Sequence, residues 1–265
     1  MTGKTNRMPM NTLKPVHACL FLADYAAWLY GCGATCTRIE KNVNRMVGAW
    51  NLNLELMIMP GSIHLTHADA STGQSQVYIK KVPHTGISFY KNTQLSKLSW
   101  NIADGRVTQE EAQREFDRII SAPPTNKWLV LLLASLANMS FCRLFGGDGV
   151  AMTVVFVATF AGFRFKQVLL DEHIDDKVVF ILCAFFSAVI GAAGYVFDLG
   201  STPEVALGTS VLYLIPGIPY INSISDMIRG QYLVSFSRFM NAMILTFCLS
   251  VGLAAGILLM NLRMF

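Results

Sequence analysis

The sequence predicts an α-helical integral membrane protein in which five transmembrane helices follow a small α+β cytoplasmic domain. Hydrophobic residues make up 53% of the 265 residues and charged residues only 14%, whereas soluble proteins carry about 25% charged residues. Residues 1–127 hold 14 of the 21 Lys and Arg residues, and residues 128–265 contain long uncharged stretches. A chain so poor in charge cannot cover a water-facing surface along its whole length. We therefore predict a cytoplasmic domain at 1–127 and a membrane domain at 128–265.

Five uncharged stretches in the second half predict the membrane helices. A helix needs about 20 apolar residues to cross the hydrocarbon core, and the last three stretches are that long. The first two have 15 residues each and need their flanks, where Arg143, Arg164 and Lys166 can snorkel toward the interface. The stretches are Trp128–Cys142, Gly149–Phe163, Val178–Phe197, Val205–Ser225 and Phe239–Leu262.

The Lys and Arg residues between these stretches predict the orientation, because cytoplasmic loops carry an excess of positive charge. The connections after the second and fourth stretches are basic, and the connection after the third has no Lys or Arg; Arg143 and Arg263 oppose the pattern. The basic residues are Arg164, Lys166, Lys177, Arg229 and Arg238. We expect residues 1–127 to be cytoplasmic and Phe265 to be external.

Hydrophobic periodicity predicts the elements of the first half. Two helices come first and are followed by three strands, with a turn at 69–73 between the second and third strands. Two further helices follow, and Thr108 with Glu111 forms a capping box at the start of the last one. Pro123 and Pro124 end the domain. The predicted helices are 16–30, 39–50, 93–102 and 108–120, and the strands lie near 54–58, 63–65 and 76–82.

No catalytic constellation is recognisable in this domain, so we predict no catalytic residues, no metal site and no cofactor. His64, His67 and His84 are spread over strands and loops, and no Ser or Cys lies in the sequence context of a nucleophile. Cys32 and Cys36 have helical spacing but lack a second ligand pair, which favours helix packing over metal binding. No nucleic-acid-binding motif is present either.

The fourth stretch is unusual because its middle reads Pro216-Gly217-Ile218-Pro219, followed by Asn222, Asp226 and Gly230. Proline within a helix removes a hydrogen bond and clashes with the preceding turn. Non-helical backbone at membrane depth persists only where protein or a water-filled cavity receives it. Broken helices of this kind build substrate sites in secondary transporters. The alternative is a proline kink that serves packing alone.

This signature, together with the segment from Gly33 to Arg38-Ile-Glu40, resembles the threonine/serine exporter (ThrE) family, and most closely the large-subunit half (YjjP type) of its split form. The resemblance runs from about His17 to the end of the chain. It implies export of small carboxylated metabolites, either threonine and serine or a dicarboxylate such as succinate. It also implies the inner membrane of a bacterium and a second, small five-span subunit of the YjjB type as partner. Homo-oligomers are a further possibility.

If the fourth stretch is broken, a short second helix is expected to begin near Tyr220. Its first N–H groups would carry the positive end of the helix dipole and suit a carboxylate. Asp226 would carry a coupling proton or pair with Arg229, and the pairing role is slightly favoured. Arg143 and Asp148 are candidate gating residues. The predicted substrate-binding residues are Pro216, Gly217, Pro219, Asn222, Ser223 and Asp226, and the family-motif residues are Gly33, Arg38 and Glu40.

Two other functions stay open at this point. One is a regulatory or scaffold membrane subunit that does not itself transport, and the other is a membrane-anchored enzyme with its chemistry in residues 1–127. Intramembrane-edge charges and the broken helix favour transport, because such groups are costly unless they are functional. Small residues also predict close helix packing, with Gly252 and Gly256 on one face of the fifth stretch and Gly191 and Gly194 in the third.

Overall fold

The computed structural model describes residues 15–68 and 75–261, so the predicted turn at 69–73, Arg263 and Phe265 lie outside the described residues. The chain forms two compact units. The N-terminal unit consists of the described residues up to Ala122 together with Ile221–Ser237, and the helical unit consists of Pro123–Tyr220 with the described residues from Arg238 onward. This division differs from the predicted one at 127/128 because a segment of the second half belongs to the N-terminal unit.

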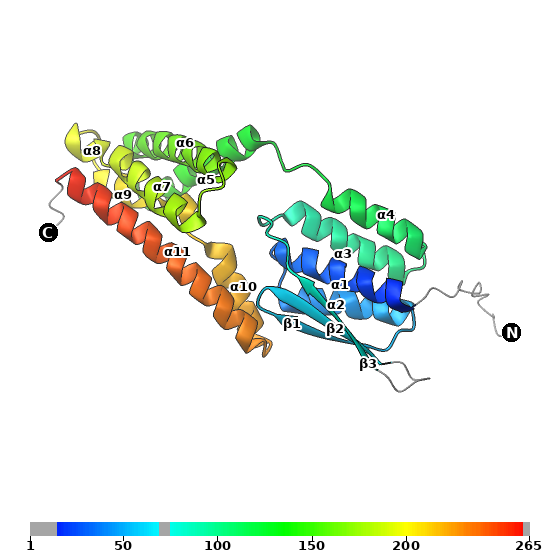
Figure 1. The fold of residues 1–265 in the computed structure, drawn as a ribbon. Coiled ribbons are helices and arrows are strands. Elements are labelled where there is room, and N and C mark those ends of the chain that lie inside the picture. The colour runs from blue at the N-terminus through cyan, green and yellow to red at the C-terminus, as the bar shows by residue number, and fades with distance from the viewer. Residues whose placement is uncertain (1–14, 69–74, 262–265) are drawn as a thin grey trace. The chain divides into compact units, whose positions relative to one another are not determined.

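The N-terminal unit has the predicted order of two helices, three strands and two helices (Figure 1). The predicted capping box is present, because the Thr108 side chain accepts from the Glu111 backbone N–H while the Glu111 carboxylate accepts from the Thr108 N–H. The elements are α1 (Pro15–Gly31), α2 (Cys36–Ala49), β1 (Leu54–Met59), β2 (Ser62–Ala68), β3 (Ser75–Lys81), α3 (Phe89–Ala103) and α4 (Gln109–Ile120).

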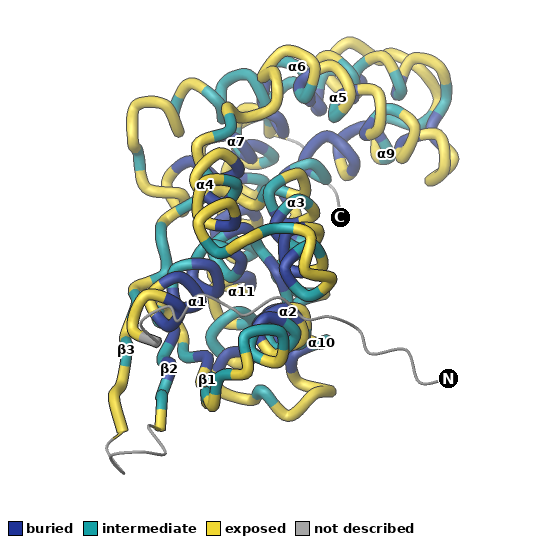
Figure 2. Tube along the Cα trace, turned by 90° about the vertical axis from the view of Figure 1, so that its right-hand side faces the viewer, coloured by how far each residue is buried: buried dark blue, intermediate teal, exposed yellow. Residues whose placement is uncertain are grey.

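The three strands form an antiparallel sheet in the order β1-β2-β3. Ile63 and Leu65 on β2 are fully buried, whereas Met57 and Ile79 on the opposite face are exposed. This alternation is expected, because successive side chains of a strand point to opposite faces. The buried face joins the core around α1, where the tube is mostly dark in Figure 2.

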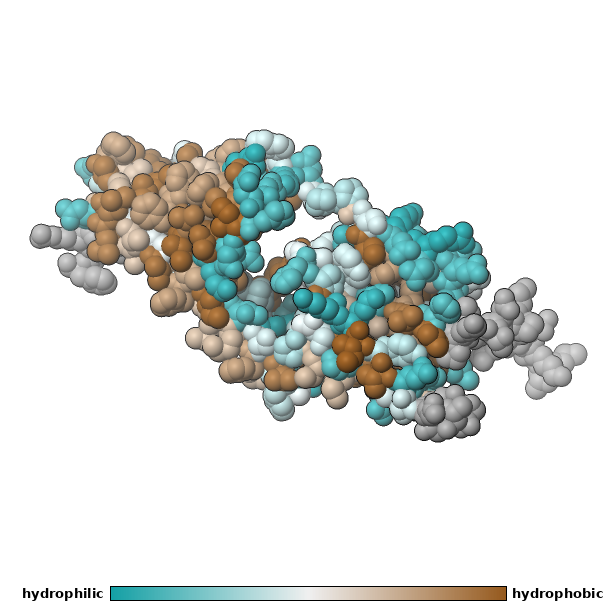
Figure 3. All heavy atoms as spheres, viewed as in Figure 1, coloured by the Kyte–Doolittle hydropathy of each residue, from teal (hydrophilic) through white to brown (hydrophobic). Residues whose placement is uncertain are grey.

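The helices of the helical unit expose large apolar surfaces (Figure 3). Leu132, Phe247 and Leu258 are among the exposed apolar side chains. Four helices are long and apolar enough to cross a membrane, and a fifth span results if the bent pair Pro203–Leu214 and Gly217–Ile228 counts as one. The elements are α5 (Lys127–Leu144), α6 (Gly149–Asp171), α7 (Asp176–Gly191), α8 (Ala193–Val196), α9 (Pro203–Thr209), η1 (Leu212–Leu214), α10 (Gly217–Ile228) and α11 (Tyr232–Leu259).

The predicted break in the fourth stretch is present, with a bend of 62°, but the second helix begins at Gly217 and not near Tyr220. The prediction treated Pro219 as part of the break. The first N–H groups of a helix have no intrahelical partner, so a proline in the first turn costs no hydrogen bond. Pro219 therefore lies inside α10, and Asn222 and Ser223 lie beyond its first turn.

The predicted close packing at glycines is also confirmed. A Cβ at Gly252 of α11 would collide with the Ile181 carbonyl oxygen of α7, and one at Gly256 would lie 2.7 Å from the Ala188 Cβ. In α7, a Cβ at Gly191 would lie 2.7 Å from the Ser210 Oγ. The paired glycines of α11 thus allow this helix to pack closely against α7 of the same chain.

The same geometric test shows that Gly194 of α8 lies close to the start of α9. A Cβ there would lie 3.0 Å from the Pro203 Cβ, so both glycines predicted for the third stretch approach α9 or its continuation. Such backbone approach is how helices associate where no hydrophobic force draws them together.

Candidate functional site

The break in the fourth predicted span is formed by Ile215 and Pro216. Ile215 has an extended backbone (φ −60°, ψ 124°), as expected for a residue that precedes proline. The N–H of Gly217 donates to the Ile215 carbonyl oxygen at 2.8 Å, and α10 starts there. Apart from its chain neighbours and the adjoining backbone of α10, no described atom lies within 4 Å of a Cβ built at Gly217. This glycine therefore borders open space and is not required by packing within the chain.

The half of the span before the break is held by buried polar side chains of the neighbouring helices. Asn138 of α5 is only 3% exposed and donates to the Thr159 Oγ at 2.6 Å and to the Thr209 carbonyl oxygen at 3.0 Å. Thr209 is the last residue of α9, so its carbonyl has no helical partner. Asn138 satisfies this group, which would otherwise be a buried acceptor without a hydrogen bond.

A second pair of polar side chains lies against α6, about one helical turn beyond Thr159. The hydroxyls of Ser187 and Tyr213 are 2.8 Å apart, and a Cβ at Gly162 would collide with both. Gly162 follows Thr159 by three residues, so the two pairs adjoin the same face of α6. We call Asn138, Thr159, Ser187, Thr209 and Tyr213 the membrane polar cluster.

The half of the span after the break is bound to the N-terminal unit. The Asn222 amide donates to the Gly33 carbonyl oxygen at 2.8 Å. The Asp226 carboxylate accepts from the Cys36 N–H at 2.8 Å and is 0% exposed. We call these two hydrogen bonds the α10 clamp. They link residues that are 189 and 190 positions apart in the sequence.

Both hydrogen bonds of the α10 clamp are made to residues at or just before the beginning of α2. Thr35 is the N-cap of α2, but its side chain makes no capping hydrogen bond. Asp226 supplies the missing acceptor from α10, and its negative charge also suits the positive end of the helix dipole. Gly33 has a φ of +86°, a left-handed backbone that glycine adopts without strain.

Two further contacts extend the hold on α10 and the start of α11. The Ser223 hydroxyl donates to the Ser235 carbonyl oxygen at 2.8 Å, and the Ser235 hydroxyl donates to the Ser223 carbonyl oxygen at the same distance. The Gln231 amide donates to the Glu40 carboxylate at 2.7 Å. Burial raises the pKa of Glu40, nearby Asp226 raises it further, and the Gln231 hydrogen bond lowers it in part.

Arg38, the remaining family-motif residue, donates to the Asn92 side-chain oxygen of α3 at 3.0 Å. Glu40 and Arg38 thus connect α2 to different neighbours, although they are two residues apart. Gly33, Glu40, Asn222 and Asp226 were predicted as two separate sets, and the structure brings them together around the start of α2.

The two candidate gating residues have structural partners in the connections of the helical unit. Asp148 is the N-cap of α6 and accepts from the N–H groups of Ala151 and Ser201. These hydrogen bonds lower the pKa of Asp148 to about 2. Arg143 donates to the Gly147 carbonyl oxygen at 3.3 Å. Both residues hold connections between helices, and their role as gates stays a prediction.

The sequence prediction missed the membrane polar cluster and the roles of Gln231 and Cys36. One signal was available for the cluster, since Asn138 is the lone amide in an uncharged stretch and buried polar residues commonly link membrane helices. No comparable signal marks Gln231 or Cys36, because their functions depend on backbone and side-chain partners about 190 residues away.

Comparisons with known proteins identify the family of the chain. The profile of a family described as "Putative threonine/serine exporter" matches residues 21–260. Two proteins named "Probable succinate transporter subunit YjjP" are similar over most of the chain. The protein from Escherichia coli K12 is 26% identical over 237 residues, which cover 87% of this chain and 90% of the relative. The protein from Klebsiella aerogenes is 25% identical over 244 residues, which cover 90% and 92%.

A third relative, "Probable threonine/serine exporter" from Mycobacterium tuberculosis H37Rv, is 25% identical over 199 residues. The match covers 74% of this chain but only 36% of that protein. No solved structure matches the chain. The family profile covers nearly all of the two units described above. The chain therefore belongs to the threonine/serine exporter family of multi-pass membrane transport proteins.

Proposed function

We propose that the chain is one subunit of a secondary exporter of small carboxylated metabolites. The carrying observation is the fourth span, which breaks at Pro216 and Gly217 next to the membrane polar cluster. Transporters commonly place substrate sites at discontinuous helices, and backbone can leave the helix at membrane depth only where protein or a cavity receives it. The substrates are threonine and serine, or a dicarboxylate such as succinate, which the relatives' names mention.

The substrate carboxylate is placed at the start of α10. The positive end of the helix dipole attracts anions, and Gly217 leaves open space there. The N–H groups of Gly217 and Tyr220 already donate to the carbonyl oxygens of Ile215 and Pro216 and Pro219 has no N–H, so the first-turn donor for the carboxylate is the Ile218 N–H. Pro216, Gly217 and Pro219 shape this end of the helix. Asn222 and Asp226 contribute by holding α10 through the clamp.

A second, small five-span subunit completes the transporter in this proposal. The two relatives that match along nearly their whole length are named as subunits, and the chain matches 36% of the Mycobacterium exporter. Secondary transporters usually form their site between two repeats. We therefore expect the purified chain alone to show only background efflux of loaded amino or dicarboxylic acids.

We place the N-terminal unit in the cytoplasm of a bacterium and the C-terminus outside its inner membrane. Lys127 at the start of α5 forms an ion pair with Asp171 at the end of α6, at 2.6 Å, and Arg164 lies over the Trp128 ring. These positive residues gather at one end of the helix pair, which favours that end as cytoplasmic. Alkaline phosphatase fused after Phe265 should be active, and fused after Val168 it should be inactive.

Export by the reconstituted pair of subunits tests the function. Gly217→Leu should abolish efflux of succinate or threonine from proteoliposomes, because the side chain fills the space at the start of α10. Gly208→Leu is the matched control, since Gly208 in α9 also borders open space but lies away from the break. Equal export by both variants would make the break a packing kink. Absence of export by the wild-type pair would favour a scaffold role.

A further inference from the structure

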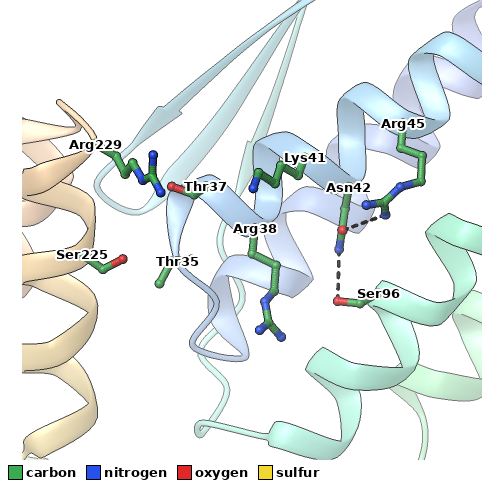
Figure 4. Close-up of a pocket in the computed structure, with 9 residues that line it drawn as sticks. All are labelled: Thr35, Thr37, Arg38, Lys41, Asn42, Arg45, Ser96, Ser225 and Arg229. Atoms are coloured by element: carbon green, nitrogen blue, oxygen red, sulfur yellow. Dashed lines mark hydrogen bonds between the residues drawn. The ribbon is translucent and has the colours of Figure 1, made fainter.

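A pocket of about 440 Å³ lies within the N-terminal unit, between α2, α3 and α10 (Figure 4). It is separate from the start of α10, where we place the transported carboxylate. Its lining consists entirely of polar and charged residues, namely Thr35, Thr37, Arg38, Lys41, Asn42, Arg45, Ser96, Ser225 and Arg229. The volume falls in the range of small-molecule sites, about 300–1,000 Å³.

The charge of the lining is strongly one-sided. Four cationic side chains line the pocket, and no carboxylate or apolar side chain is among the lining residues. Ligand sites that take rings or long carbon chains are mostly apolar, so this pocket suits a compact ligand. Four like charges in one cavity favour a ligand that carries several negative charges.

Two of the cations are held in place by protein contacts. The Arg45 guanidinium donates to the Asn42 side-chain oxygen at 3.1 Å and to the Ser99 hydroxyl at 2.6 Å, and it lies 3.7 Å from the centre of the Trp100 ring. Arg38 is held by its hydrogen bond to Asn92. A ligand that binds these side chains therefore does not have to order them first, which favours affinity.

The other two cationic side chains are not held by contacts of this kind. Lys41 and Arg229 are exposed, and within the described ranges neither side chain has a hydrogen-bond or ion-pair partner. They come from α2 and from the turn after α10, so they approach the pocket from separate elements. Their charges are available to a ligand.

A neutral donor completes the lining. The Thr37 hydroxyl is buried and, among the described residues, has no hydrogen-bond partner, although a buried polar atom without one is costly. The Cys36 N–H at the start of α2 already donates to Asp226. Recognition of an anion here therefore falls to the side chains and not to the helix end.

We propose that this pocket binds compact oxyanions with at least two negative charges, such as dicarboxylates and small diphosphates, in preference to zwitterionic amino acids. The ammonium group of a zwitterion would meet four cations and no acid. A second anionic group gains a further charge-assisted contact. The assignment concerns binding to the N-terminal unit and does not depend on whether the chain exports the same molecule.

The test is calorimetric titration of the purified full-length chain in neutral detergent with succinate, pyrophosphate and threonine. Succinate and pyrophosphate should bind, pyrophosphate more tightly because of its greater charge, and both more weakly at high salt. Lys41→Gln and Arg229→Gln should each weaken binding about tenfold, the loss expected for one charge-assisted contact. Lys97→Gln is the control, because Lys97 is exposed on α3 and does not line the pocket.

Three outcomes would overturn the proposal: threonine binding as tightly as succinate, no binding of either dianion, or an equal loss in the Lys97 variant. A further arm repeats the titration in lipid nanodiscs. Binding that is the same in nanodiscs of neutral and of anionic lipid supports a soluble ligand. Loss of binding only in anionic nanodiscs would assign the pocket to a lipid headgroup and overturn the soluble-ligand assignment. Because no transport is measured, failure here is distinct from failure of the export proposal.

Discussion

The two halves of the fourth predicted span, before and after Pro216, differ in which groups form hydrogen bonds with their polar atoms. Before the break, side chains of membrane helices do so, and Asn138 bonds the last carbonyl of α9. After the break, the N-terminal unit does so, and Asp226 caps α2 while Asn222 bonds Gly33. The predicted span therefore contributes to two compact units, and the boundary between them lies between Tyr220 and Ile221, shortly after the break. The comparison teaches that the break lies close to a boundary between two sets of stabilising contacts.

The largest effect is expected where the first half rests on α7. In Gly191→Leu, the new side chain would meet the Ser210 Oγ at 2.7 Å and the Leu207 Cα at 3.3 Å. Overpacking against backbone should cost about 3 kcal/mol and lower the detergent melting temperature. Gly208→Leu, which points into open space, should leave the melting temperature nearly unchanged. Equal melting temperatures for the two variants would contradict the packing of α9 on α7.

The next effect concerns the clamp on the second half. Asp226→Ala leaves the Cys36 N–H without its acceptor in a buried site and should destabilise the protein by about 1–3 kcal/mol. Asp226→Asn keeps an acceptor oxygen and should retain most of that stability, since Asn and Asp cap helices about equally well. Thermal unfolding of the two variants measures the difference.

Export by the Asp226→Asn variant then separates two roles of this carboxylate. A stable variant that exports at the wild-type rate assigns Asp226 to the clamp alone. A stable variant without export would show that the charge itself is needed, as for a coupling proton. If Asp226→Ala is as stable as wild type, the clamp is not a stabilising contact.

A smaller effect is expected from the membrane polar cluster. Asn138→Ala removes the partner of the Thr209 carbonyl oxygen and should cost about 1 kcal/mol, in line with side-chain hydrogen bonds between membrane helices. Ser140→Ala is the control on the same helix, because the Ser140 hydroxyl bonds the Leu136 carbonyl oxygen of its own helix. Indistinguishable unfolding of both variants would remove Asn138 as an anchor of α9.

The smallest effect is a pH dependence at Glu40. Its pKa is raised in the folded protein, mainly by burial, so the folded state binds the proton more tightly than the unfolded state. The resulting stability is fully present below the unfolded pKa and is lost as pH rises through the raised folded pKa. As pH rises from about 4, near the unfolded pKa of a glutamate, through the raised folded pKa, the melting temperature of wild type should fall relative to that of Glu40→Gln. A constant difference over this range would argue against a raised pKa.

Local chemistry made part of this architecture predictable. The helix and strand order of the N-terminal unit followed from periodicity, the capping box from Thr108 and Glu111, and the break from the prolines. The predicted start of the second helix was wrong, because Pro219 is compatible with the first turn of a helix. The close approach of Gly191 and Gly252 to their neighbours followed from the absence of a side chain at these positions.

The partners of Asn222 and Asp226 were beyond reach of the sequence. The prediction considered neighbours on the same helix, such as Arg229, whereas Asp226 bonds a backbone N–H that any residue other than proline could supply. A backbone partner leaves no side-chain pattern to read. The basic pocket was also beyond reach of the sequence. Its four cationic side chains lie on α2 and in the turn after α10, which only the fold brings together.

The claim that the N-terminal unit holds the second half of the span is tested most directly by cross-linking. Glu40 and Gln231 contact each other at 2.7 Å, and the six native cysteines are buried. In membranes containing the full chain with both Glu40→Cys and Gln231→Cys, a short bismaleimide should join the two positions, as detected by mass spectrometry of the peptides. Each single variant serves as the control. Efficient cross-linking only in the double variant is the predicted result, and its absence while both cysteines react with a monofunctional maleimide would contradict the account.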